Sequence, residues 1–329
     1  MKRLLACAAA VLSIAMWTPT AANAAIELKL GHVCPATGDR LEQSAQVFKK
    51  YVEEKSGGEI VVKTFPASQL GGEREMLESI QMGTLECGTI TNAPFSNFLK
   101  ETLVFDIPFV FSKAAHAHGE FGQYLLSLVE KRMGVKALVF GENGLRHFTT
   151  TKVAAHTPKD LAGLKLRVME NPVHMEMIRG LGAIPTPMAF AELYTALAQG
   201  VVDGQENPVA LNQSMRFYEV QKYMIKTGHL YAPYIFVLSN DFYNSLSEKH
   251  RRIIQDGAKL WRKTERELNA KQCESGEEFM KSKGLTIIEL TPEEHAQFQK
   301  ATKSAEQMVR KSVGDEIVNR FMKAVDAAK

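Results

Sequence analysis

The sequence has little net charge. Its 329 residues include 40 Lys and Arg against 37 Asp and Glu, for a formal charge of +3 at pH 7. A protein that binds the nucleic-acid backbone normally carries a strong basic excess or a clustered basic patch, so we expect no nucleic-acid partner. The composition, 45% apolar, 23% charged and 8% aromatic, also excludes a disordered, collagen-like or disulfide-scaffold protein. The length favours two domains.

Long apolar runs are missing except at the N-terminus. There, two basic residues precede an apolar stretch at residues 4–17, and Ala22-Asn23-Ala24 offers a small-x-small cleavage site. The stretch is shorter than the roughly 20 residues of a membrane-spanning helix, and the whole pattern is typical of a secretory signal peptide. We therefore predict a signal peptide at residues 1–24, in preference to a lipoprotein site at Cys7 or a buried N-terminal helix. The mature chain would be exported, soluble and nearly neutral.

Cysteines and metal ligands are scarce. After cleavage only Cys34, Cys87 and Cys273 would remain, at spacings that match neither a CxxC pair nor a zinc site. This odd set leaves a Cys34–Cys87 disulfide open, but we favour free thiols because a chain of this length buries enough surface without a covalent link. The nearest approach to a metal cluster is HAHGE at residues 116–120. Its two histidines would point about 200° apart on a helix, so we expect no metal site.

Enzyme signatures are absent as well. No nucleophile elbow, zincin, Walker or dinucleotide-binding motif occurs at a junction between a strand and a helix. Paired glutamates near the C-terminus are typical of solvated helices rather than of a catalytic pair. We therefore expect no catalytic residue and no cofactor.

Short apolar strands alternate with amphipathic helices along the chain, which is the pattern of an α/β fold. The predicted strands lie at residues 27–33, 60–65, 85–91, 135–140, 164–169, 201–205 and 234–239. The predicted helices start after Asp39 and Thr291 and also occupy residues 73–82, 114–133, 173–181, 190–199, 247–283 and 315–328. The helix at residues 247–283 would be about 50 Å long, so we expect it to span both domains. No flexible linker occurs, which favours a hinge between them.

One polar residue stands out within an apolar strand. Arg167 lies among Leu164, Leu166 and Val168, where it could pair with a carboxylate of the core. Alternatively, its guanidinium could present a fork of N–H donors to a ligand carboxylate. The segment DGQENP at residues 203–208 then places an amide at the end of a strand, where α/β sheets bind ligands.

Several ordered motifs carry a family resemblance. They are FPASQLGGEREML at residues 65–77, GLKLRV at 163–168, PTPMAFAELYTAL at 185–197, VVDGQENP at 201–208 and FYEVQKY at 217–223. Together they closely resemble the substrate-binding proteins of TRAP transporters, the tripartite ATP-independent periplasmic transporters, in the DctP-like family. The resemblance covers essentially the whole mature chain.

The resemblance implies an α/β clamshell of the periplasmic binding protein kind, type II-like. Each lobe would be a β-sheet flanked by helices, and a long helix would span both lobes. Lobe I would comprise residues 25–144 and 233–272, and lobe II residues 145–232 and 273–329. The ligand would lie in the cleft between them.

The motifs also imply individual ligand contacts. Arg167 in KLRV matches the arginine that forms a salt bridge with the substrate carboxylate. Asn207 in GQENP matches the amide donor to the same group, and Phe190 in MAF matches the aromatic residue that packs over the ligand. Arg146 in NGLRHFTT matches a second basic position, with a salt bridge at the hinge as the alternative role.

Four further positions are expected at the cleft. Glu73 and Tyr234 fall where family members make polar contacts that vary with the substrate. His32 and Asn92 end the first and third predicted strands and are expected to line the cleft. Thr91 lies in the stretch where some acidic-sugar binders carry an Arg or Glu, which argues against a sialic-acid-like substrate.

The resulting expectation is a periplasmic solute-binding protein rather than an enzyme. It would capture a small organic acid, either a sugar acid such as a uronate or a C4-dicarboxylate, and deliver it to the membrane subunits of a TRAP transporter. We expect a monomer. A ligand-sensing partner of a sensor protein and a secreted hydrolase remain the alternatives.

Overall fold

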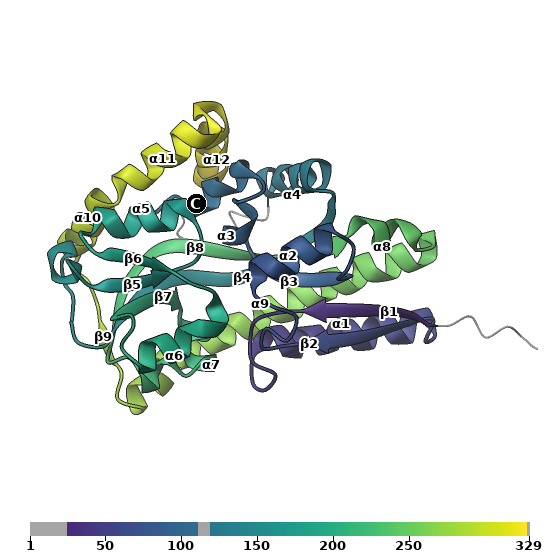
Figure 1. Ribbon diagram of the computed structural model, residues 1–329, viewed down its shortest axis with the longest axis horizontal. Coiled ribbons are helices and arrows are strands. Elements are labelled where there is room, and N and C mark those ends of the chain that lie inside the picture. The colour runs from purple at the N-terminus through teal and green to yellow at the C-terminus, as the bar shows by residue number, and fades with distance from the viewer. Residues whose placement is uncertain (1–24, 111–118, 328–329) are drawn as a thin grey trace, which may run out of the picture.

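The centre of the molecule is a single mixed β-sheet (Figure 1). The computed structural model describes residues 25–110 and 119–327, so the predicted signal peptide and the histidines at 116 and 118 lie outside the described residues. Within these ranges, nine strands are hydrogen-bonded in the order β2-β1-β3-β8-β4-β7-β5-β6, with β9 paired to β8. The strands are β1 (Ile26–Gly31), β2 (Ile60–Phe65), β3 (Cys87–Thr91), β4 (Val135–Thr150), β5 (Lys165–Val168), β6 (Ile184–Pro187), β7 (Gly204–Pro208), β8 (Tyr223–Ser239) and β9 (Thr286–Ile288).

Helices cover both ends of this sheet, so the predicted α/β class is confirmed. The α-helices are α1 (Arg40–Ser56), α2 (Glu73–Gln81), α3 (Asn92–Phe95), α4 (Glu120–Met133), α5 (Pro172–Gly180), α6 (Leu193–Ala198), α7 (Val209–Ser214), α8 (Asn240–Ser245), α9 (Glu248–Ser282), α10 (Pro292–Ala301), α11 (Lys303–Val313) and α12 (Asp315–Ala327). Short 3₁₀ helices include η1 (Lys100–Asp106), η3 (Pro158–Leu161), η4 (Phe190–Glu192) and η5 (Phe217–Glu219).

Two long strands connect the two halves of the sheet. β4 and β8 are antiparallel from the pair Val135–Ser239 to the pair Thr150–Tyr223. β8 also pairs with β3 near one end, and β4 pairs with β7 near the other. In Figure 1, β1 to β3 therefore lie at one end of the sheet and β5 to β7 at the other, with β4 and β8 running between them.

The apolar pattern of the sequence predicted only the outer part of each long strand. The missed parts contain Gly141, Gly144, Gly228 and Pro233, residue types that normally interrupt strands. The register between β4 and β8 shifts at three places, two of them in the missed parts, so the apolar alternation that marks a regular strand is lost there. The strand β6 was also missed, because two of its four residues are prolines. It lies at the edge of the sheet, where proline is tolerated.

The long helix α9 confirms the prediction for residues 247–283. It contains 35 residues and begins after Ser247, whose side chain accepts a hydrogen bond from the backbone of His250. It packs against α1 from one half of the molecule and α7 from the other. Its Trp261 ring lies 5.1 Å from that of Phe236 in β8, which in turn lies 5.0 Å from Phe48 in α1. One continuous apolar core thus joins the long helix to the sheet.

The C-terminal helices contact both halves. α11 packs against α5 and η1, and α12 packs against α4 and η1. The Phe321 ring of α12 lies 5.3 Å from Phe121 and 5.9 Å from Phe105. The chain after α9 therefore ties the end of the sheet at β5 to β7 to the opposite half.

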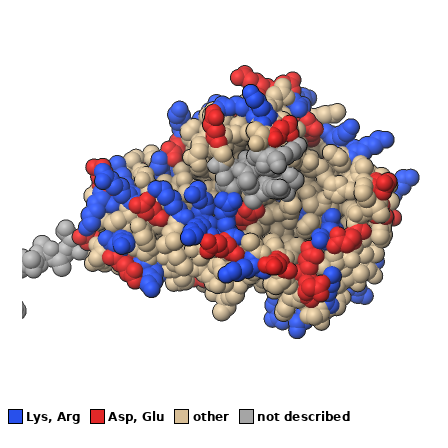
Figure 2. Space-filling view, turned by 180° about the vertical axis from the view of Figure 1, so that it is seen from behind, with Lys and Arg blue, Asp and Glu red and all other residues tan. Residues whose placement is uncertain are grey.

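The remaining sequence predictions concern thiols, metals and the surface. Cys34, Cys87 and Cys273 are free, as favoured, and the first two are buried. Within the described ranges, no group of three or more His, Cys, Asp or Glu side chains is arranged to hold a metal ion, and no helix is long and apolar enough to cross a membrane. Acidic and basic side chains both occur across the face shown in Figure 2, in keeping with the small net charge.

Candidate functional site

A buried cavity brings six of the eight predicted ligand-binding residues together. Its empty space, part of which is open to solvent, is about 250 Å³. The predicted residues that line it are Glu73, Arg146, Arg167, Phe190, Asn207 and Tyr234, and the other lining residues are Val33, Thr91, Asn143, Met169 and Leu211. A wider cleft of about 1260 Å³, between the start of α2 and residues 187–192, shares Glu73, Arg167, Met169 and Phe190 with it. The cavity therefore adjoins a larger opening between the two halves of the molecule.

Arg167 is a buried cation without an acidic partner. It lies on β5 with 2% of its surface exposed, and its Nε and Nη2 donate to the backbone oxygen of Met188 at 3.2 and 2.8 Å. Among the described residues it forms no ion pair, and its buried Nη1 has no hydrogen-bond partner. The Phe190 ring centroid lies 5.8 Å from the guanidinium carbon. Burial lowers the pKa of Arg167 to about 10, so the side chain is still a cation at neutral pH.

Arg146, in contrast, has an acidic partner of its own. It lies on β4, and its Nε and Nη2 donate to the two carboxylate oxygens of Glu206 on β7, the second at 2.8 Å. His229 Nε2 lies 3.4 Å from the same carboxylate. Burial by itself would raise the pKa of Glu206, but the charge of Arg146 and the contact with His229 outweigh it and lower that pKa below its usual range. Arg146 thus lines the cavity and also forms the salt bridge that was its alternative role.

Asn207 lies at the end of β7, within a network of amides. Its Nδ2 donates to Gln205 Oε1, and its backbone oxygen accepts from Asn212 Nδ2 at 3.0 Å. Gln205 Nε2 donates in turn to Asn212 at 2.9 Å. An amide nitrogen carries two hydrogens, so Asn207 keeps one donor for a ligand while the network holds its orientation.

The opposite wall of the cavity carries oxygen atoms. Glu73, in the first turn of α2, accepts from the Thr91 backbone N–H at 2.8 Å and from its hydroxyl at 2.7 Å. Burial raises the pKa of Glu73 above its usual value despite these hydrogen bonds. The Tyr234 hydroxyl lies 3.7 Å from Cys34 Sγ, and burial raises the pKa of Tyr234 well above its usual value. This wall offers an acceptor and a neutral hydroxyl to a ligand.

The structure places the other two predicted residues, His32 and Asn92, away from the cavity. His32 is fully buried, and its Nε2 lies 2.8 Å from Glu42 in α1. Asn92 Nδ2 donates to Asp106 at 2.8 Å. In each case the adjacent residue, Val33 or Thr91, lines the cavity instead. Thr91 is the last residue of β3 and Asn92 the first of α3, so the backbone changes direction between the two side chains.

Sequence reasoning missed two polar residues at this site. Glu206, the partner of Arg146, is an acidic residue inside the VVDGQENP motif, and its position in a buried strand was a usable signal. Asn143 lines the cavity, and its proximity to Arg146 in the segment ENGLR was the only sequence signal for it.

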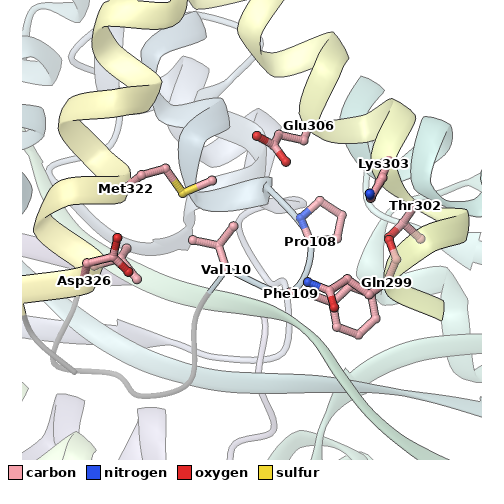
Figure 3. A pocket seen from close by; sticks show the side chains of 10 residues that line it. Pro108, Phe109, Val110, Gln299, Thr302, Lys303, Glu306, Met322 and Asp326 are labelled. Carbon is pink, nitrogen blue, oxygen red and sulfur yellow. The ribbon is translucent and has the colours of Figure 1, made fainter. Parts of the chain in front are cut away.

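A second cavity lacks these features. It holds about 670 Å³ between the segment after η1 and the C-terminal helices, as Figure 3 shows. Its charged lining residues are Lys303, Glu306 and Asp326, and Lys303 and Asp326 are exposed to solvent. An organic acid bound there would meet two carboxylates and no buried cation, so the cavity around Arg167 is the better candidate.

Comparison with known proteins identifies similar chains. The family model described as bacterial extracellular solute-binding protein, family 7, matches residues 30–312. A solute-binding protein of Verminephrobacter eiseniae is 41% identical over 74% of this chain and 73% of its own length. The C4-dicarboxylate-binding periplasmic protein of Rhodobacter capsulatus is 29% identical over 94% of each chain. The crystal structure of a TRAP periplasmic solute-binding protein from Polaromonas, bound to D-erythronate, is 36% identical, covers 90% of this chain and 98% of its own, and superposes with a TM-score of 0.86.

Proposed function

The chain belongs to the bacterial extracellular solute-binding proteins of family 7, and we propose that it captures a small monocarboxylic acid around Arg167 for a TRAP transporter. The observation that carries the proposal is the unpaired charge of Arg167. A buried cation without a counter-ion is costly, because it has lost its hydration and gained no anion in return. A ligand carboxylate supplies that anion, and the unpartnered Nη1 of Arg167 supplies a donor for it.

The neighbours of Arg167 suit the rest of the ligand. The free N–H of Asn207 reaches the same carboxylate, and Phe190 packs against the carbon chain. A charge-assisted hydrogen bond contributes about 1.5–3 kcal/mol net, whereas micromolar binding needs about 8 kcal/mol. Burial of the carbon chain and contacts with the opposite wall must therefore contribute the larger share of the binding free energy.

The charges of the cavity favour one carboxylate over two. Glu206 neutralises Arg146, which leaves Arg167 as the cation available to a ligand. Glu73 adds a carboxyl group on the opposite wall. A second ligand carboxylate would lie near that group without a free cation, so a sugar acid fits the site better than a C4-dicarboxylate.

Closure of two lobes around the ligand would complete the site. We propose lobe I at residues 25–144 and 233–272, and lobe II at residues 145–232 and 273–329, with α12 contacting lobe I. Glu73 and Tyr234 then approach the ligand from lobe I, while Arg167, Phe190 and Asn207 approach it from lobe II. A ligand that touches both lobes favours the closed form by its differential affinity for that form.

The proposed setting is the periplasm, after removal of the signal peptide at residues 1–24. The protein would act as a monomer and hand the acid to membrane subunits without altering it. A role as the ligand-sensing partner of a sensor protein would use the same cavity, and it is separated from transport by measuring uptake in a deletion strain.

A ligand screen tests the proposal. The mature protein, starting at residue 25, is incubated with erythronate, galactonate, galacturonate, 2-oxobutanoate and succinate, and its thermal unfolding is recorded. A ligand at 100 times its dissociation constant adds about 2.7 kcal/mol to the free energy of unfolding. We expect the monocarboxylic acids to raise the Tm and to be recovered unchanged. If none of the acids raises the Tm, the proposal is contradicted. If a bound acid is converted to a product, the protein is an enzyme.

A further inference from the structure

An irregularity in β4 turns a second side chain toward the cavity. The pairing with β8 runs from Glu142 opposite Pro233 to Gly144 opposite Ala232, so Asn143 is an extra residue without a partner. Residues three apart in a regular strand face opposite sides. The bulge cancels one step of that alternation, and both Asn143 and Arg146 therefore line the same cavity.

A buried arginine fixes the orientation of the Asn143 amide. Arg40 Nη2 donates to Asn143 Oδ1 at 3.0 Å, and Arg40 Nε donates to Glu265 Oε1 at 3.1 Å. The other oxygen of Glu265 accepts from the backbone N–H of Glu142 at 2.8 Å. These hydrogen bonds join α1, α9 and the bulge in β4 to one another. A guanidinium has only donors, so the oxygen of Asn143 must face Arg40. In a flipped amide, the N–H groups of Asn143 would lie against the N–H groups of Arg40.

This orientation leaves a donor for a ligand. Asn143 is 1% exposed, and its Nδ2 is buried without a hydrogen-bond partner among the described residues. A buried donor that has lost water and gained no acceptor is unfavourable. Like the Nη1 donor of Arg167 in the same cavity, it marks a place where a bound molecule supplies the acceptor.

We infer that Asn143, oriented by Arg40, determines specificity by donating a hydrogen bond to a hydroxyl oxygen of the captured acid. The inference rests on the proposed function and names the ligand class more narrowly. A hydroxyl both accepts and donates, so it can accept from Asn143 and donate to Glu73 or Tyr234 on the same wall. A bare methylene group would leave the Asn143 donor unpaired.

Calorimetric titration with matched four-carbon acids tests the inference. The ligands are 2,3,4-trihydroxybutanoate, 2-hydroxybutanoate, 3-hydroxybutanoate and butanoate, and the proteins are the wild type, Asn143→Ala and the surface control Asn319→Ala. In the wild type and the control, we expect at least one hydroxylated acid to bind more tightly than butanoate by a factor of ten or more. In Asn143→Ala the ratio of the affinity for the hydroxylated acid to the affinity for butanoate should fall roughly tenfold. The affinity for butanoate itself should change less than about twofold.

The outcomes separate the two proposals. If the wild type binds no acid in this set or in the screen above, the proposed function fails. If the wild type binds butanoate as tightly as the hydroxylated acids, or if Asn143→Ala weakens all of them equally, only the role of Asn143 is overturned.

A second variant keeps the test valid if Asn143→Ala fails to fold. Asn143→Asp retains an oxygen for Arg40 and replaces only the donor nitrogen. The ligand hydroxyl then has one hydrogen for two carboxylates, those of Asp at this position and of Glu73. The ratio of the affinity for the hydroxylated acid to that for butanoate should therefore fall again. An unchanged ratio in folded Asn143→Asp overturns the inference.

Discussion

Arg146 and Arg167 line the same cavity and are equally buried, yet their surroundings differ. Arg146 forms a two-point salt bridge with Glu206, and His229 lies close to the same carboxylate. Arg167 contacts a backbone oxygen and an aromatic ring, and forms no ion pair within the described chain. Arg146 therefore has its own carboxylate partner, whereas Arg167 has no carboxylate within salt-bridge distance among the described residues.

This difference assigns the two side chains to different tasks. The pair of Arg146 and Glu206 joins β4 to β7 near the centre of the sheet, and its charges are balanced with or without a ligand. Arg167 becomes balanced only when a carboxylate arrives. Loss of Arg146 should therefore act mainly on folding, and loss of Arg167 mainly on binding.

The largest expected effect is on stability, in the variant Arg146→Met. It leaves the Glu206 carboxylate fully buried without its cation, and breaking a buried ion pair in this way costs about 3–5 kcal/mol. Urea unfolding of the ligand-free protein measures the loss. The double variant Arg146→Met with Glu206→Leu, which removes both charges, should regain most of it. A loss below about 1 kcal/mol in the single variant would show that the pair is not structural.

Much of the fold could be predicted because helix ends and apolar periodicity are local signals. Thr291 and Glu294 form the predicted capping box of α10, and the predicted C-terminal helix is helical from Asp315 to Ala327, the last described residue. The inner parts of β4 and β8 could not be predicted, because bulges, glycines and buried polar residues remove the alternation on which strand prediction depends. Only pairing over a long sequence separation defines those parts.

The candidate site shows the same limit. Motifs indicated Arg167, Asn207 and Phe190, and all three line the same cavity. They could not decide which of two adjacent side chains faces the cavity, as at Thr91 and Asn92. Nor could they indicate Asn143, since its direction depends on a bulge that exists only when β4 and β8 are paired.

The next effect in size concerns affinity, in the variant Arg167→Met. We expect the affinity for the acid that most raises the Tm to fall roughly 30- to 100-fold, equivalent to about 2–3 kcal/mol, since charge-assisted hydrogen bonds are lost. The ligand-free variant should lose no more than about 1 kcal/mol of stability and could gain some, because no internal ion pair is broken and a buried charge without a counter-ion is removed. Calorimetry and urea unfolding measure the two quantities on the same samples.

The conservative variant Arg167→Lys sharpens this test. It keeps the positive charge but not the planar fork of donors, so its affinity should lie between those of the wild type and Arg167→Met. Unchanged affinity in Arg167→Met would exclude this side chain as the carboxylate ligand, whatever happened to stability.

The smallest of the three effects is a loss of stability at low pH, and it arises near Arg146. The adjacent His147 is buried, its Nδ1 accepts from the Gly228 backbone N–H at 3.0 Å, and burial lowers its pKa to about 3. The unfolded chain takes up a proton on this histidine below about pH 6.5, whereas the folded chain does not until near pH 3. The stabilising contribution of His147 is therefore complete above pH 6.5 and falls as the pH decreases toward 3.

At pH 5 the expected loss from His147 is about 2 kcal/mol relative to pH 7, from 1.36 kcal/mol per pH unit over about 1.5 units. The variant His147→Gln keeps an acceptor for Gly228 but does not titrate. Between pH 7 and 5, its free energy of unfolding should therefore fall by about 2 kcal/mol less than that of the wild type. The surface variant Asn319→Ala should decline as the wild type does, because it removes no titrating group. Parallel pH profiles for His147→Gln and the wild type would instead mean that the folded protein protonates His147 as readily as the unfolded chain.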